Sequence, residues 1–394
     1  MSGVALSAFL DWSTNSGPQY LSGPNHIIND VAAESYLFGE MMRGKTPDQL
    51  LQGSNKLKET VFLEGVSTFQ TFKRGADVVF LNPQKDVTLE LQWRFMLDYM
   101  SWDEAEYLLQ SSSASGRDGL KTMYKQMAYS KEQRQMQSTI DGMEDLLWAN
   151  PSGASQFAEM EAAGGQTPYS LPVFVHENGS NNGGFDSNWT TTELITQATY
   201  AANWDNYRAQ YDYTDPLDTD GDLDGLFDMF EETTIKTKFK KPTLPNSSTS
   251  DKFEPEAKRS GSSICTSTLG KKLVCSLNRQ SNDSLINPND AYYGGNPSWN
   301  GIPIMQVAAL DTAALYDDGA SGYTTEAAAT NAGPRFYFFQ WAYLNWRFHR
   351  AKYFQKREKK EPINKIGVFI HPVEIWGNLT CTSRRRQAIC YPGA

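Results

Sequence analysis

Five acidic residues between positions 220 and 231 have the spacing of a calcium-binding loop. The segment DGDLDGLFDMFE follows the pattern D-x-D-x-D-G-x5-E, in which carboxylate oxygens surround the ion and a glycine makes the sharp turn. Glu231 would close the site through both of its oxygens. The full candidate set is Asp220, Asp222, Asp224, Asp228 and Glu231, with Gly225 at the turn.

The same segment also has the features of a helix N-terminus. Acidic side chains are favoured there by the helix macrodipole, and LFDMFEETTI continues as a helical body. A calcium loop also needs a helix before it, whereas the preceding YDYTDPLDTD, with Pro216, favours an extended chain. We therefore expect no cofactor and no metal, and keep calcium at residues 220–231 as the alternative.

Three consecutive arginines lie near the end of the chain, in TSRRRQ, residues 382–387. Their guanidinium groups could bind phosphates through paired hydrogen bonds. Beside a strand, three arginines more often form ion pairs at a subunit contact, and we favour that interpretation. Replacing Arg384, Arg385 and Arg386 together by Gln is then expected to impair assembly of a folded subunit.

No arrangement of residues predicts an enzyme. His26, His176, His349 and His371 have no carboxylate or cysteine at metal-ligand spacing. The chain has no G-x-S-x-G segment, no phosphate-binding P-loop and no G-x-G-x-x-G segment after a strand. We therefore expect no catalytic residues.

The cysteines and the hydropathy place further limits on the chain. Cys265, Cys275, Cys381 and Cys390 form no C-x-x-C pair, so we expect reduced thiols and no zinc site. No run of about 18 uncharged apolar residues predicts a membrane span, and no signal peptide is recognisable. We regard the five N-x-S/T sequences as chance occurrences; they lie at Asn178, Asn188, Asn246, Asn282 and Asn378.

Charge is distributed unevenly along the 394 residues. The formal net charge is -10, but residues 151–235 carry 15 acidic residues against one base, and residues 335–394 carry 12 bases against three acids. An acidic chain is not suited to general nucleic-acid binding. We expect the basic stretch 347–386 to meet the acidic stretch 159–232 mainly across subunits, where each exposed pair contributes about 0–1 kcal/mol.

Hydrophobic periodicity predicts a mixture of strands and one long helix. Residues 87–97 alternate, with Val87, Leu89, Leu91, Trp93, Phe95 and Leu97 on one face, which we expect to be buried. Residues 60–72 and 76–82 also favour strands, so residues 60–100 form a long hairpin-like excursion. A helix is predicted over residues 117–148, with an apolar stripe of Met136, Ile140, Met143 and Leu147.

Other segments predict shorter elements. A helix is expected at 191–201, and strands at 302–310, 335–349 and 366–376. The strand at 335–349 is almost continuously aromatic, so we expect both of its faces to be packed in the middle of a sheet. Pro372 favours an edge or a bulge for the strand at 366–376.

The C-terminal third resembles a known family. YFFQWAYLNWRFHRAKYF (337–354), followed by WGNLTCTSRRRQAICYPGA (376–394), is similar to the end of tailed-bacteriophage major capsid proteins. The likeness continues upstream in the hairpin ending WRF (93–95), the helix ending LLWANP (146–151) and the KPT segment (241–243).

The resemblance implies an α+β fold of the Hong Kong ninety-seven type. Its parts would be an N-terminal arm, an extended loop, a peripheral domain on a spine helix, an axial domain and a C-terminal return to the peripheral domain. It places Trp376, Asn378 and the arginines in a structural strand. In this chain the five parts fall at residues 1–58, 59–104, 105–189, 190–340 and 341–394.

The resemblance also implies the function. The chain would be a structural protein that assembles into pentamers and hexamers of an icosahedral shell, enclosing double-stranded DNA without reading its sequence. Scaffolding, portal and decoration proteins would be possible partners, with no membrane involved; assembly would occur in the host cytoplasm and the product would be the virion capsid. The alternative is a calcium-dependent binding or carbohydrate-active protein.

Two features of assembly follow as expectations. The arm is too short for a helical scaffolding domain, so any scaffold is expected to be a separate chain. Lys73 and Lys85 are the candidates in the extended loop for a covalent bond to a neighbour's asparagine. Most such lysines are solvated, so we expect no covalent cross-links.

Overall fold

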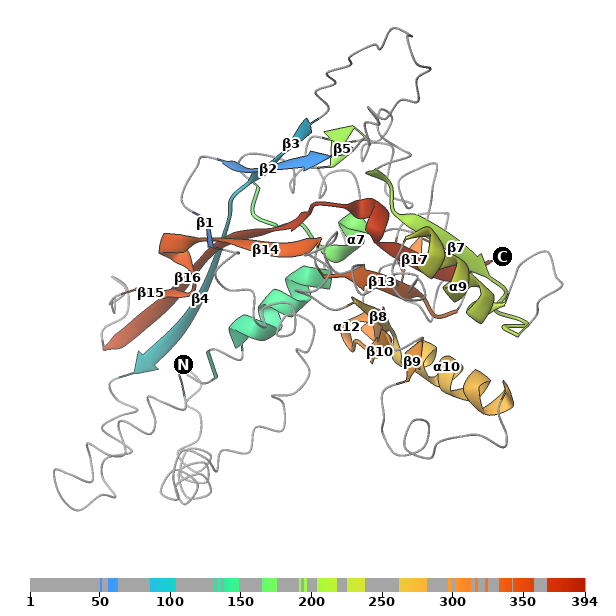
Figure 1. Cartoon of the computed structure of the whole chain (residues 1–394). Helices are drawn as coiled ribbons and strands as arrows, with labels where there is room; N and C mark the ends of the chain where they lie inside the picture. Colours follow the sequence, from blue (N-terminus) through green and yellow to red (C-terminus); the bar gives the residue numbers. More distant parts are fainter. Residues whose placement is uncertain are drawn as a thin grey trace, which may run out of the picture. The chain divides into compact units, whose positions relative to one another are not determined.

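The computed structural model describes about half of the chain, in many short stretches (Figure 1). Of the predicted extended loop, residues 63–85 lie outside these stretches, and so do Lys73 and Lys85. The described residues are 50–51, 56–62, 86–103, 131, 134–135, 138–148, 165–175, 191–192, 195–196, 204–217, 225–237, 262–281, 297–299, 302–312, 316–317, 323–324, 333–341, 343–357 and 367–393.

The chain forms two units, each built from three separate stretches of sequence. The first unit contains Met1–Glu40, Phe95–Glu144 and Phe348–Trp376; the second contains Met41–Arg94, Asp145–Arg347 and Gly377–Ala394. Helices and strands are mixed along the chain, which confirms the predicted α+β class. The predicted division at residues 58, 104, 189 and 340 stays a prediction.

A six-stranded mixed sheet organises the second unit, in the order β7-β17-β13-β8-β10-β9. The central strand β13 is antiparallel to both β17 and β8. The outer pairs β17–β7 and β10–β8 are parallel, and β9 closes the edge as an antiparallel strand. The bounds are β7 Tyr207–Tyr211, β8 Ser262–Thr266, β9 Ser298–Trp299, β10 Ile302–Gln306, β13 Phe336–Gln340 and β17 Ala388–Pro392.

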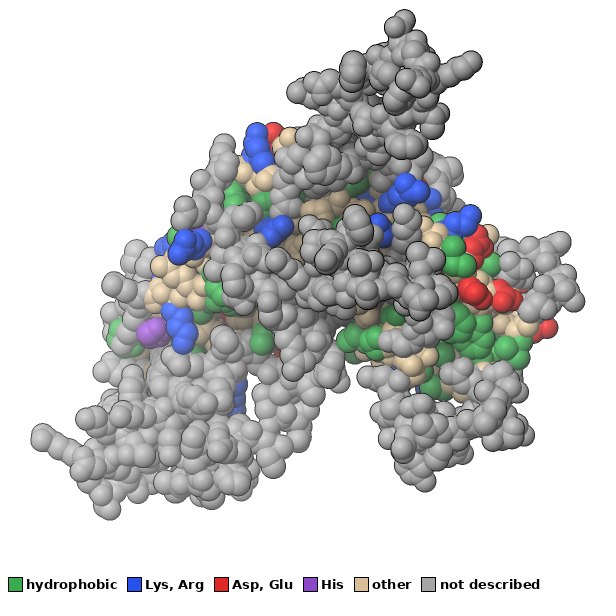
Figure 2. All heavy atoms as spheres, in the orientation of Figure 1, with side chains coloured by type: hydrophobic (Ala, Val, Ile, Leu, Met, Phe, Trp, Pro, Cys, Tyr) green, Lys and Arg blue, Asp and Glu red, His purple; other side chains and the backbone are tan. Residues whose placement is uncertain are grey.

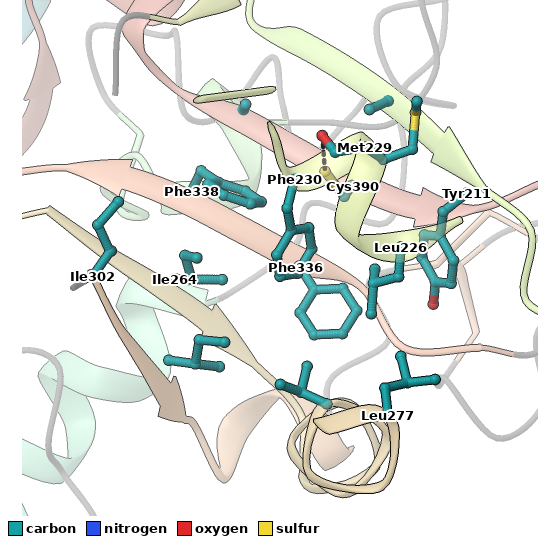
Figure 3. Close-up of a cluster of buried hydrophobic side chains, with 14 residues drawn as sticks. Tyr211, Leu226, Met229, Phe230, Ile264, Leu277, Ile302, Phe336, Phe338 and Cys390 are labelled. Carbon is teal, nitrogen blue, oxygen red and sulfur yellow. Dashed lines mark hydrogen bonds between the residues drawn. The ribbon is translucent and has the colours of Figure 1, made fainter. Parts of the chain in front are cut away.

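Both faces of β13 are packed, as its aromatic sequence predicted. All five of its residues are buried. On one face Phe230 meets Phe336 and Phe338 at ring-centroid distances of 5.0 and 5.1 Å (Figure 3). On the other face Trp148 lies 5.7 Å from Tyr337. The predicted strand 335–349 is nevertheless two strands, because Trp341 and Tyr343 lie in a turn, closed by a 3.1 Å hydrogen bond from the Tyr343 N–H to the Gln340 carbonyl, before β14 (Leu344–His349) begins.

Two helices supply apolar side chains to this core. Helix α9 (Leu226–Lys236) begins directly after Gly225, as the sequence predicted, and buries Leu226, Met229 and Phe230. Helix α10 (Thr268–Ser281) buries Val274 and Leu277. Both helices contribute to one buried cluster, and Figure 3 shows Leu226 of α9 and Leu277 of α10 both lying beside Phe336. Helix α10 is not among the elements predicted from the sequence.

We expect Gly270→Ala to destabilise the second unit by about 1–3 kcal/mol, a typical cost of overpacking. A Cβ at Gly270 would fall on Thr266 Oγ1 and lie 3.1 Å from Pro334 Cβ. Thr266 Oγ1 donates a hydrogen bond to the Arg335 carbonyl at 2.8 Å, which the added methyl would displace. Urea unfolding measures the change. Gly142→Ala is the control, because nothing beyond its chain neighbours and its own helix backbone lies within 4 Å of its added Cβ, and it should stabilise by up to about 1 kcal/mol.

A five-stranded sheet contains β1, β14, β16 and β15 in that order, with β4 also paired to β16. Strand β16 extends beyond the predicted 366–376, and Pro372 lies in its first half. A separate hairpin pairs β2 with β3 over seven residues each. The bounds are β1 Leu50–Leu51, β2 Lys56–Phe62, β3 Asp86–Gln92, β4 Arg94–Asp103, β15 Gln355–Lys356 and β16 Val368–Cys381.

The predicted strand 87–97 is interrupted at Trp93, and its buried face changes there. Leu91 and Trp93 are buried as predicted, but Arg94 is buried as well. Burial then follows the even positions, so Phe95 and Leu97 are 60% and 63% exposed. The prediction that they share the buried face of Leu91 is therefore wrong, because one residue outside the ladder moves every later side chain to the other face.

The described part of the predicted helix 117–148 is helical at residues 131, 134–135 and 138–148. Its buried positions include Met143 and Leu147, as predicted. The stripe then continues through Thr139 and Gln135, whereas Ile140 is only partly buried. Gln135 Nε2 donates to the His371 carbonyl at 3.2 Å, which explains a polar residue on this face.

The helix predicted at 191–201 is wrong in its described part. Thr191–Thr192 (β5) and Ile195–Thr196 (β6) pair as short antiparallel strands. β-Branched side chains favour strands, and they outweigh the helical spacing here.

None of the described helices is both long and apolar enough to cross a membrane. The remaining elements are α7 Leu171–Phe174, α12 Ala309–Thr312, β11 Tyr316–Asp317, β12 Tyr323–Thr324, η3 Arg350–Lys352 and η4 Arg384–Arg386.

Candidate functional site

The arginine run forms the short helix η4 and not a strand. Arg384 is 1% exposed, and its Nε donates to the Phe174 carbonyl at 3.0 Å. Its guanidinium also lies 5.9 Å from the Trp204 ring centroid and 4.0 Å from Asp205 Oδ1. Arg384 therefore stabilises the subunit itself, and the expectation that all three arginines serve a subunit contact is wrong for this residue.

The neighbouring arginines have different surroundings. Arg385 is exposed, and Arg386 lies with its guanidinium carbon 5.8 Å from the Tyr343 ring centroid. Replacing all three by Gln would therefore damage the fold through Arg384, so that variant cannot separate assembly from folding.

Asn378 joins two distant segments of the second unit to β16. Its side chain is fully buried; Oδ1 accepts from the Tyr169 N–H at 2.9 Å, and Nδ2 donates to the Gln92 carbonyl at 3.0 Å. An amide is suited to this position because it can accept and donate at once. The burial also leaves no space for a glycan on this Asn-Leu-Thr sequence.

Gln387 holds the end of the central strand. It is fully buried; Oε1 accepts from the Gln340 N–H at 2.9 Å, and Nε2 donates to the Gln340 carbonyl at 3.3 Å. Its own carbonyl accepts from the Tyr207 N–H at 3.1 Å. Thus Asn378, Arg384 and Gln387, all from the tail that carries the family resemblance, satisfy backbone groups far away in sequence.

Trp376 lies in the first unit within an aromatic and charged cluster. Its ring meets Phe95 edge-on at a centroid distance of 4.7 Å, and the His349 ring lies 5.5 Å away. Lys352 Nζ lies 5.6 Å from the Trp376 ring centroid and 3.0 Å from Glu374 Oε2. Trp376 lies in strand β16, as the family resemblance implied.

Glu374→Gln is expected to reduce stability by less than about 1 kcal/mol at neutral pH, and by nothing in acid. Burial raises the pKa of Glu374, but hydrogen bonds from Lys352 and Arg357 outweigh it and hold the pKa below its ordinary value. The pKa of Glu374 is lower in the folded protein than in the unfolded chain, where it is about 4.3. The ionised carboxylate therefore stabilises the fold at pH values above the unfolded pKa, and this stabilisation is lost as the pH falls through the folded pKa. Urea unfolding at pH 7 and at pH 3 tests this; a difference that persists in acid would contradict it.

The candidate calcium ligands are only partly within the described residues. Asp220, Asp222 and Asp224 lie outside them, whereas Asp228 and Glu231 are exposed on α9. Gly225 has φ -65° and ψ 167°, an extended conformation that precedes the helix. Among the described residues no group of three or more His, Cys, Asp or Glu could hold a metal ion.

The described histidines and the cysteines have structural environments. His349 Nδ1 accepts from the Ala351 N–H at 3.2 Å and caps η3. None of the four cysteines, all of which lie within the described residues, forms a disulfide. Burial raises the pKa of Cys390 to about 12, despite a hydrogen bond with Thr233 that lowers it, so this thiol is unreactive.

Within the described residues, the basic and acidic stretches meet at Asp205 and Arg384. Asp205, from the acidic stretch, pairs with Arg384 as described and also with Arg208, whose Nη2 lies 2.7 Å from Asp205 Oδ2. On the face shown in Figure 2, most of the visible acidic side chains lie at the right, in the region of α9 and β7. The expectation that the two stretches meet mainly across subunits stays a prediction for the remaining charges.

Solved structures provide the comparison with known proteins. The chain is similar to a chain of the cyanophage A-1(L) capsid asymmetric unit, with 10% identity and a TM-score of 0.49, over 93% of this chain and 95% of that one. It is also similar to a chain of Mycobacterium phage Che8 (10% identity, TM-score 0.40, 93% and 97% covered). A third similarity is to the bacteriophage PhiM1 mature capsid (11%, 0.41, 86% and 82%).

All three structures come from phages. No protein-family model and no curated protein sequence matches the chain.

Proposed function

We propose that this chain is the major capsid protein of a tailed bacteriophage. Copies of it would form pentamers and hexamers that close an icosahedral shell around double-stranded DNA. The observation that carries the proposal is the tail segment 376–394, whose sequence resembles that family. Its polar residues Asn378, Arg384 and Gln387 are all buried and bonded to backbone groups. The segment is thus part of the subunit framework, as a shell protein requires.

The proposed role is structural and needs no catalytic residue or cofactor. The net charge of -10 supports enclosing DNA without binding it tightly, because carboxylates and phosphates repel one another. The shell would be assembled in the host cytoplasm and become part of the virion. Separate scaffolding, portal and decoration proteins are further proposed partners.

Electron microscopy of the purified full-length chain tests this proposal. We expect closed, hollow particles built from five-fold and six-fold rings. Single subunits at every protein concentration and ionic strength would contradict it.

A separate experiment tests calcium binding at residues 220–231. We expect the same melting temperature with calcium as with a chelator, whereas a calcium-dependent binding protein would lose stability in chelator.

A further inference from the structure

A row of three large apolar side chains points outward from strand β4. Phe95, Leu97 and Tyr99 are 60%, 63% and 61% exposed. The alternate side chains are fixed on the opposite face: Met100 is buried, and Asp98 Oδ2 accepts from Thr139 Oγ1 at 2.7 Å. Because the strand is held from that side, the exposed row cannot turn inward without breaking these contacts.

The two ends of the row differ in character. At one end the edge-on contact with Trp376 at 4.7 Å fixes the Phe95 ring. At the other end the same face continues into exposed Ser101 and Asp103. An uncharged apolar centre beside a polar margin is the usual composition of a protein–protein interface.

The size of the row indicates what covers it. Large side chains present about 200 Å² each, so three that are six-tenths exposed offer about 350 Å². A stable pair of proteins buries about 800 Å² on each partner. The row alone is therefore too small to hold a lasting dimer. It suits one of several contacts that a subunit makes in a closed assembly, where small contacts add together.

We propose that this face of β4, defined by Phe95, Leu97 and Tyr99, is a contact between copies of this chain. The proposal rests on the shell function proposed above and identifies a surface that would build it. The second copy removes the three apolar side chains from water, which stabilises the assembly.

Leu97→Asp tests the proposal, because it places a charge at the centre of the row and leaves the buried face unchanged. The matched control is Ile235→Asp on α9, where the side chain is 67% exposed. We expect the Leu97 variant to lose at least ten-fold in assembled fraction by sedimentation velocity, with the melting temperature of its unassembled subunit unchanged, and the control to assemble like the unmodified chain. Normal assembly of the Leu97 variant, or equal loss in both, would overturn the β4 contact and leave the shell function standing. An unmodified chain that never assembles would overturn both.

A photo-cross-linker at position 97 tests the contact directly and does not depend on a charged substitution being tolerated. With benzoylphenylalanine in place of Leu97, irradiated particles should give a band at twice the subunit mass of 44.2 kDa. The same probe in place of Ile235 is the control and should give little of this band. A cross-link to a different protein, or none in assembled particles, would show that no second copy covers the row.

Discussion

Replacing Arg384 by Gln is expected to lower the free energy of unfolding by about 2–4 kcal/mol, enough to unfold a marginal subunit. Gln is too short to keep the 3.0 Å hydrogen bond from Arg384 Nε to the Phe174 carbonyl, so a buried acceptor loses its donor. The cation–π contact with the Trp204 ring is lost as well. Asp205 keeps Arg208 as its partner, which limits the loss. Urea unfolding of the unassembled subunit measures the change.

Arg385→Gln is the matched control for this prediction. It makes the same chemical change one residue away, at an exposed side chain, and should alter stability by less than about 0.5 kcal/mol. Equal effects of the two variants would show that the charge of the run matters and the burial of Arg384 does not.

Asn378→Ala is expected to cost about 2–4 kcal/mol. The change removes the acceptor of the buried Tyr169 N–H and the donor to the part-buried Gln92 carbonyl, leaving both backbone groups without this partner. Asn378→Asp should be no better, because it keeps the acceptor but loses the donor and buries a charge. Thermal and urea unfolding measure both variants.

Gln210→Ala provides the comparison for Asn378. It removes an amide from an exposed position of strand β7 and should change stability by less than about 0.5 kcal/mol. If Asn378→Ala were equally mild, its two hydrogen bonds would not contribute to holding the segments together.

Local sequence patterns predicted the elements in which burial follows from the residue types of the segment itself. The continuous aromatic run predicted that β13 is packed on both faces, and the LFDMFEETTI segment predicted α9 after Gly225. The outward direction of Phe95 and Leu97 on β4 could not be predicted. The strand is interrupted at Trp93, which turns both side chains outward, yet the apolar–polar alternation of the sequence continues unchanged across this position. Helix α10 contains Leu273, Val274 and Leu277 at helical spacing, and this spacing is sufficient to predict a helix there.

The buried polar residues of the tail could not be predicted in the same way. An Arg-Arg-Arg sequence is typical of a solvated or contact surface. Arg384 is buried because Phe174 and Asp205, which are 210 and 179 positions away, supply its partners only after folding. The family resemblance correctly indicated a structural role for Trp376 and Asn378, but it did not distinguish Arg384 from Arg385.

The most direct test of the central claim is the mass of the purified full-length chain in solution, measured by light scattering after size-exclusion chromatography. A self-assembling shell predicts a particle of megadalton mass that scatters as a hollow sphere, in equilibrium with a 44.2-kDa subunit or its pentamers and hexamers. A species that stays at 44.2 kDa across protein and salt concentrations would contradict the shell function.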